Sequence, residues 1–460
     1  MLHDFISAQK SAFADYTELR AQRNSSQAVV LLAGNMATNT QSTTSGVSAR
    51  VYRGGTFGFA SSAEYSEASV KDVIEAATRN AAFMDANVKR GTPPIPSAAS
   101  GKTDLKTKVH GQAPQDKLIG FAKELDEIIK EKYKNLTSRT VSLNCLDIEK
   151  LLAISDGADG RSFLPRAILY VVMTAETHDG APVELYEIFG GFGGFEDHFT
   201  DAKLLLPGLD KLYGQLMDKR EGVFANAGLR KCVLHSELAG ILAHEAVGHT
   251  VEADMVLGGS VAADNMNKQV ASEIVNMTDF ANNAYGKRCP VPVYVDDEGI
   301  EAEDVALIEN GVLKSFMHSR DTARQFETKP MGNGRAFLFS DEPLIRMRNT
   351  AILPGKDKLD EMIAGVDDGY YLIKTGNGQA DSTGEFMFSV ELGYEIKNGK
   401  LGKAIRETTI SGVAFEMLKT VDMISDEMTW MSGGFCGKKQ PMTVGMGGPA
   451  LRCEINIGGR

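Results

Sequence analysis

HSELAGILAHEAVGHTVEAD, residues 235–254, combines a helical pattern with the side chains most capable of chemistry in this chain. Its apolar residues recur at helical spacing, which predicts a helix near 236–252. His244, Glu245 and His249 interrupt the apolar face, so three residues able to bind a metal or transfer a proton lie within six positions. The stretch predicts a helix that carries a metal site.

The spacing of the two histidines departs from the common zinc-peptidase pattern, in which i and i+4 residues point in nearly the same direction. His244 and His249 are at i and i+5, which would set them about 140° apart on a regular helix. Gly248 permits a different geometry, so we predict a π-type widening or a break at about Val247 to Gly248 that brings both rings together. The alternative is a pair of ordinary core histidines beside a helix-face glutamate.

A third ligand is expected from outside this helix, because catalytic zinc usually has three protein ligands and one open position. Cys436 is the best candidate, since the neighbouring glycines in MSGGFCGKKQ leave the backbone free to bend. Lys438 and Lys439 beside it would favour the thiolate. The remaining cysteines are expected to be buried or inert thiols: Cys145, Cys232, Cys289 and Cys453.

These residues form a minimal set for hydrolysis if zinc binds His244, His249 and Cys436. Glu245 would then take a proton from water as the general base. An alternative is a peptide-binding or regulatory scaffold subunit with a structural metal site and little turnover; a weaker one is a non-enzymatic regulator of a DNA-associated protein. Glu245 favours the enzyme, because a structural zinc site gains nothing from a base beside its ligands.

Outward from this helix, the second half of the chain is predicted to be mainly β. Asn310-Gly311 and Asn398-Gly399 lie between alternating apolar residues and predict hairpins, and VPVYV at 291–295 reads as another short alternating run. We predict an α+β fold with an N-terminal α+β domain at 1–220. A mainly antiparallel β metallopeptidase domain at 221–460 would carry the metal-site helix.

The first half is expected to place helices against strands. GVSARVYRGGTFGFASS predicts a hairpin around Gly54-Gly55, and helices are predicted to open at Ser69 and at about Gln115. Lys89 to Pro114, rich in Pro, Gly, Ser and Lys, predicts a surface excursion. In the second half, the acidic cluster at 296–298 before Gly299 is interpreted as a hairpin tip and not as a calcium loop.

Composition restricts the class of protein. The formal net charge is -12 over 460 residues, which argues against direct binding to nucleic acid. No apolar stretch approaches the ~20 residues that span a bilayer, and the N-terminal segment lacks the apolar core of a signal peptide, so we expect neither membrane insertion nor export. Five cysteines, an odd number without a tight framework, fit a reducing, cytoplasmic setting.

Several ordered motifs together resemble the TldD/PmbA family of bacterial and archaeal peptidases. They are HEAVGHTVEAD, MGNGR, RMRNT, GNGQADSTGEFMFSVELGYEIKNG and FCGKKQPMTVGMGGPALRCEINIGG. The resemblance is to the catalytic TldD-like branch and implies a zinc-dependent peptidase. It implies His244, His249 and Cys436 as ligands and Glu245 as the base.

The resemblance also implies a partner and a substrate class. The PmbA-like branch lacks the HExxxH signature and pairs with the catalytic branch in a dimer that encloses the active site, so we expect a homodimer or a heterodimer with a PmbA-like subunit. Substrates would be peptides or unstructured protein segments held as extended strands. An older family label, modulator of DNA gyrase, is interpreted as an indirect effect.

Overall fold

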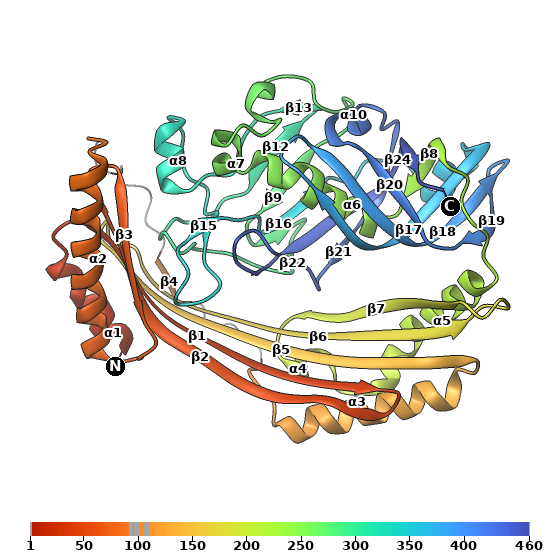
Figure 1. Ribbon diagram of the computed structural model, residues 1–460, viewed down its shortest axis with the longest axis horizontal. Helices are drawn as coiled ribbons and strands as arrows, with labels where there is room; N and C mark the ends of the chain where they lie inside the picture. The colour runs from red at the N-terminus through yellow and green to blue at the C-terminus, as the bar shows by residue number, and fades with distance from the viewer. Residues whose placement is uncertain (1, 92–94, 96–101, 105–109, 460) are drawn as a thin grey trace.

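The computed structural model describes residues 2–91, 95, 102–104 and 110–459 and has an α+β fold built on two large sheets (Figure 1). The first sheet contains β1 (Tyr16–Leu32), β2 (Asn35–Arg53), β3 (Thr56–Ser62), β4 (Lys102–Asp104), β5 (Leu136–Ile154), β6 (Asp159–Glu176) and β7 (Pro182–Phe192). Its order is β3-β2-β1-β5-β6, and both β4 and β7 pair with β6. All pairings are antiparallel except that of β4, which is parallel.

The two faces of the first sheet have different partners, because successive side chains of a strand point to opposite faces. Buried residues such as Leu169 and Val171 share a core with α3 (Gln115–Lys132) and α5 (Leu206–Arg220), which lie along the outer face (Figure 1). On the opposite face, the Tyr170 hydroxyl donates a hydrogen bond to the Gly433 carbonyl oxygen, at 2.9 Å. This inner face therefore contacts the second half of the chain.

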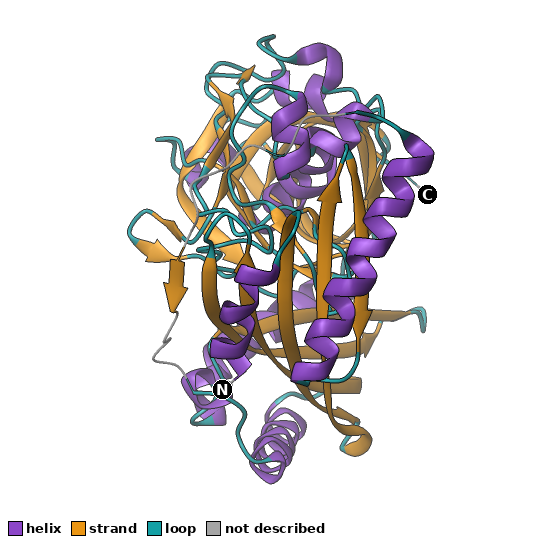
Figure 2. Ribbon diagram, turned by 90° about the vertical axis from the view of Figure 1, so that its left-hand side faces the viewer, coloured by secondary structure: helices purple, strands orange, loops and turns teal. Residues whose placement is uncertain are grey.

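Two of the N-terminal predictions are confirmed and one is corrected. β2 and β3 form the hairpin around Gly54-Gly55, and α3 begins at Gln115. The preceding helix, α2 (Glu67–Val88), packs on β2 and β3 at the end of the molecule that faces the viewer in Figure 2. Its N-cap is Ser66, whose side chain accepts from the Ser69 N–H, so Ser69 as the start of the helix was wrong. The other α-helices among the described residues of this half are α1 (Leu2–Ala8) and α4 (Phe195–His198).

The second sheet is mainly antiparallel and has eleven strands in the described part of the chain. Its main path runs through β13 (Val312–Leu313), β12 (Val305–Glu309), β9 (Met277–Phe280), β16 (Asn349–Ile352), β24 (Gly445–Ile457), β20 (Thr408–Val413), β18 (Glu385–Lys397), β17 (Asp368–Ala380) and β8 (Gly228–Leu234). β19 (Lys400–Ile405) pairs with β18, and β21 (Met423–Met431) pairs with β24. Both Asn-Gly hairpins are confirmed, with positive φ at all four residues.

The run at 291–295 is not a strand, so that prediction was wrong. Only Val295 forms an isolated bridge, with Glu301. Pro290 and Pro292 lack N–H donors for a ladder. This half also contains two-stranded sheets, in which β10 (Asn283–Ala284) pairs with β11 (Lys287–Arg288), β14 (Gly334–Arg335) with β15 (Leu344–Ile345), and β22 (Phe435–Cys436) with β23 (Met442–Thr443). Its short helices include α8 (Arg320–Gln325), α9 (Leu359–Ala364) and α10 (Ala414–Lys419).

The acidic cluster at 296–298 closes a tight turn, as predicted, but the turn is buried against the first sheet. The Asp297 carboxylate accepts from Lys150 Nζ at 2.6 Å, and Glu298 accepts from Arg50 Nη2 at 2.5 Å. Both bases belong to the first sheet. Buried carboxylates require such partners, so the turn acts as a charged connection between the two halves.

The predicted excursion over 89–114 lies largely outside the described residues. The division of the chain at 220/221 stays a prediction; β7 ends at Phe192, α5 follows, and β8 begins at Gly228. In the described part of the chain, no helix combines the length and apolar character needed to cross a membrane.

Candidate metal centre

The helix at 236–252 changes its winding where the histidines lie. It begins as α6 (Ser236–Leu242), widens into the π-helical η3 (Ala243–Gly248) and tightens into the 3₁₀ turn η4 (His249–Val251), before α7 (Ala253–Leu257). The predicted widening is confirmed, although it starts at Ala243, earlier than expected. The ring centroids of His244 and His249 are consequently 5.1 Å apart.

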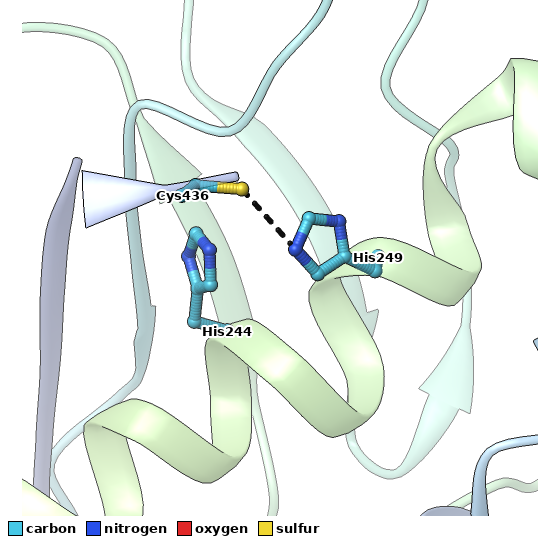
Figure 3. Close-up of side chains that lie close together, drawn as sticks. All are labelled: His244, His249 and Cys436. Carbon is cyan, nitrogen blue, oxygen red and sulfur yellow. Dashed lines mark hydrogen bonds between the residues drawn. The ribbon is translucent and has the colours of Figure 1, made fainter. Parts of the chain in front are cut away.

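Cys436 reaches the two histidines from the short strand β22. Its Sγ atom lies 3.3 Å from His249 Nε2, and potential ligand atoms of His244, His249 and Cys436 all lie within 4.8 Å of one another (Figure 3). Among the described residues, no other group of three potential ligands from His, Cys, Asp and Glu is this close, so His198, His235 and His318 are not part of such a group.

The environment of His244 shows whether this cluster suits a metal ion. Its side chain is fully buried, yet neither ring nitrogen has a hydrogen-bond partner among the described residues. Buried polar groups are normally paired, and an unpaired one is costly. Two imidazoles and a thiol are also a donor set typical of zinc. The cluster therefore fits a zinc ion, which would satisfy a His244 nitrogen.

His249 is oriented by Glu252, a residue that was not predicted. Glu252 Oε2 lies 2.8 Å from His249 Nδ1, which leaves Nε2 directed toward Cys436. Glu252 is fully buried and contacts Lys438 Nζ at 3.2 Å. A carboxylate behind a ligating histidine is a frequent feature of metal sites. The sequence signal was an acid three residues after the histidine, which a 3₁₀ or α turn places on the same side.

The histidines also control the ionisation of Cys436. Burial opposes the thiolate, but the adjacent imidazoles of His244 and His249 outweigh it and lower the pKa of Cys436 to about 3. The thiolate is the form that binds metals. Lys438, which was expected to favour the thiolate, instead pairs with Glu252 and with Asp254, at 2.8 Å, so that part of the prediction was wrong.

The loop around Cys436 is anchored from two sides. Arg346, fully buried, donates from Nη2 to the Cys436 carbonyl oxygen at 2.8 Å and from Nη1 to that of Gln440 at 2.7 Å. Tyr170 of the first sheet holds the Gly433 carbonyl oxygen. Side-chain hydrogen bonds from distant elements thus fix the strand that carries the thiol.

Glu245 lies beside the cluster without being enclosed by it. Its Oε2 atom is 3.6 Å from His249 Nε2, and 28% of its side chain is exposed.

The other cysteines are free and buried, as expected, and burial raises the pKa of each thiol: Cys145, Cys232, Cys289 and Cys453.

The chain is similar to family models and to known proteins over most of its length. The chain matches PmbA/TldA metallopeptidase domain 1 over residues 17–81, the central domain over 110–212 and the C-terminal domain over 228–459. A metalloprotease of Methanocaldococcus jannaschii is 30% identical over 96% of this chain and 97% of its own length. A zinc metalloprotease TldD homolog of Saccharolobus solfataricus is 35% identical, over 66% of each chain.

Solved structures show the same fold. TldE from Thermococcus kodakarensis superposes with a TM-score of 0.78 at 18% identity over the full length of both chains. A Thermotoga maritima protein that carries the DNA gyrase modulator label gives 0.80 at 18% identity over 99% of both chains. From the matches to all three domains and the relative aligned over almost the whole chain, we conclude that this protein belongs to the PmbA/TldD metallopeptidase family.

Proposed function

We propose that this chain is a zinc-dependent peptidase in which His244, His249 and Cys436 hold the metal and Glu245 is the general base. The observation that carries the proposal is that His249 and Cys436 converge on buried His244, whose ring nitrogens have no partner among the described residues. Glu245 is next to His244 in the same widened turn. A relative named as a zinc metalloprotease supports the metal and the class of reaction.

Each residue has a distinct part in the proposed reaction. Zinc, when bound, supplies Lewis acidity that activates water near neutral pH and polarises a peptide carbonyl. Glu245, partly exposed, accepts the proton of the attacking water and returns it to the leaving amine. Glu252 holds the His249 ring in position throughout.

The Glu245→Gln substitution tests this function. Because the amide cannot accept the proton, hydrolysis of an unstructured peptide should fall by about 10²- to 10⁴-fold while stoichiometric zinc remains. Glu273→Gln, at an exposed glutamate that is not part of the metal cluster, is the control. Unchanged turnover in Glu245→Gln would reject the role of the base, and zinc without any hydrolysis in the wild type would favour the scaffold alternative.

We also propose the cellular context that the sequence indicated. The chain would act in the cytoplasm as the catalytic subunit of a homodimer or of a heterodimer with a PmbA-like subunit, on peptides or unstructured protein segments. The fold shared with TldE is compatible with such pairing between similar subunits. Peptide hydrolysis measured with and without a PmbA-like subunit tests the assembly.

A further inference from the structure

Arg166, on the inner face of β6, is a buried arginine without a counter-ion in the part of the chain that the structure describes. Only 7% of the residue is exposed. Nε, Nη1 and Nη2 are all buried and have no hydrogen-bond partner among the described residues. Arginine is rarely buried unless it is paired, because removing a charge from water without compensation is strongly unfavourable. No anion among the described residues satisfies the five N–H donors of its guanidinium.

The guanidinium remains charged in this environment. Burial lowers the pKa of Arg166 to about 10, which is still well above neutrality. Two carboxylates line the same cavity, but both have other partners: Asp297 accepts from Lys150 and Ala336, and Asp296 accepts from the Gly334 N–H. Neither of these described carboxylates is therefore free to pair with Arg166, and its guanidinium is available to an anionic group of a bound molecule.

The cavity at Arg166 would admit a small anionic group. Its volume is about 60 Å³, enough for a group of a few non-hydrogen atoms. Apolar side chains, including Leu164 and Val291, form much of its wall. In such surroundings a hydrogen bond between charged groups is stronger than in water. A planar carboxylate matches the guanidinium fork with two parallel hydrogen bonds.

The cavity adjoins the strand pair that carries the metal-site cysteine. Its wall includes Met442 and Thr443 of β23, whose partners in β22 are Cys436 and Phe435 respectively. The guanidinium carbon of Arg166 lies 5.6 Å from the centre of the Phe435 ring. The exposed residue Phe435 thus contacts Arg166 and directly precedes the proposed zinc ligand Cys436 in β22.

We propose that Arg166 binds a carboxylate of the peptide substrate, so that this subunit prefers peptides with a free C-terminus or an acidic side chain close to the scissile bond. This inference rests on the proposed peptidase function. A carboxylate site at Arg166 would select a charged group of the substrate that the zinc cluster itself does not select. It would also give the buried guanidinium a partner.

The test measures peptide affinity in zinc-loaded full-length protein carrying Glu245→Gln, so that binding is observed without turnover. Three peptides of one neutral sequence are compared by calorimetry: the free acid, the C-terminal amide, and the amide with one internal Glu. The free acid should bind roughly 10- to 100-fold more tightly than the amide, as a charged hydrogen-bonded pair provides. The third peptide separates a terminal carboxylate from a side-chain carboxylate.

Substitution at Arg166 should abolish the preference for a carboxylate. Arg166→Met retains the length of the side chain and removes the charge, and Arg166→Lys retains the charge without the planar fork, so the preference should vanish in the first and weaken in the second. Arg161→Met, on the same strand at an exposed residue paired with Glu149, should retain it. Arg166→Met should unfold at the wild-type temperature or above, because an unpaired buried charge is lost.

Three results would overturn the inference: equal affinity for acid and amide in the Glu245→Gln protein, an undiminished preference after Arg166→Met, or a lower unfolding temperature for Arg166→Met with loss of binding to every peptide. The last result would identify Arg166 as a structural residue. Peptide hydrolysis by the wild type is measured separately, so a failure of the peptidase proposal is distinguishable from a failure of carboxylate binding.

Discussion

Cys436 Sγ lies 3.3 Å from His249 Nε2, although the two residues are 187 positions apart in the chain. The contact joins the 3₁₀ turn η4, which follows the widened helix, to a two-residue strand, and both are fixed by buried charged side chains, Glu252 and Arg346. The pairing is therefore a property of the whole second half of the chain and not of one motif.

Cys436→Ala should remove most of the bound zinc, because two histidines without the thiolate leave an incomplete ligand set. Metal analysis of the purified variant measures this. Cys145→Ala, at a buried cysteine in the first sheet, should keep stoichiometric zinc. Full zinc content in Cys436→Ala would mean that other residues assemble the site.

Glu252→Gln should weaken zinc affinity by about 10- to 100-fold, because the buried carboxylate that orients His249 is replaced by a neutral amide. Competition with a chelator gives the affinity. Asp254→Asn is a matched control, since Asp254 is the other acid that contacts Lys438. Equal loss of affinity in both variants would show that Lys438, and not the orientation of His249, is responsible.

Gly248→Ala should destabilise the protein by about 1–3 kcal/mol, because the added Cβ would lie 2.1 Å from the Sδ atom of buried Met347. Urea unfolding measures the loss, and the double variant with Met347→Ala should recover part of it. Gly120→Ala, in α3 with nothing within 4 Å of the new Cβ, should not be destabilising. If Gly248→Ala were as stable as the wild type, the close packing of the π-helical turn would be refuted.

Asp147→Asn should change the dependence of stability on pH. Burial raises the pKa of Asp147 to about 6, above its value in an unfolded chain, near 4. Between these values the unfolded state releases its proton first, so this carboxylate lowers the stability of the native state as pH rises from about 4 to 6. The substitution should therefore increase stability by about 1–2 kcal/mol at pH 7 and little at pH 3.5.

Urea unfolding across this pH range tests the Asp147 prediction, with Asp264→Asn at an exposed position as the control. Parallel stability curves for Asp147→Asn and the wild type would contradict a raised pKa.

Local rules predicted much of the fold and the ligands. Asn-Gly pairs determine hairpins through their tolerance of positive φ, and a five-residue spacing of histidines can serve one site only if the helix widens. The N-cap of α2 was missed because Ser66 and Ser69 lie three residues apart and either could cap a helix.

Long-range partners of charged residues could not be predicted in this way. Lys438 follows Cys436 closely in the sequence, yet its ammonium group pairs with the carboxylates of Glu252 and Asp254. Arg166 has no local pattern that distinguishes it from an exposed arginine on a strand. Contacts with segments distant in sequence determine the environments of both residues, and only the tertiary arrangement contains that information.

X-ray absorption at the zinc edge tests the central claim most directly, since it reports the atoms bound to the metal in the intact protein. Ligation by His244, His249 and Cys436 predicts one sulfur at about 2.3 Å and nitrogen or oxygen ligands at about 2.0–2.1 Å. A spectrum with no sulfur ligand would contradict the account, because Cys436 would then lie beside the metal without binding it.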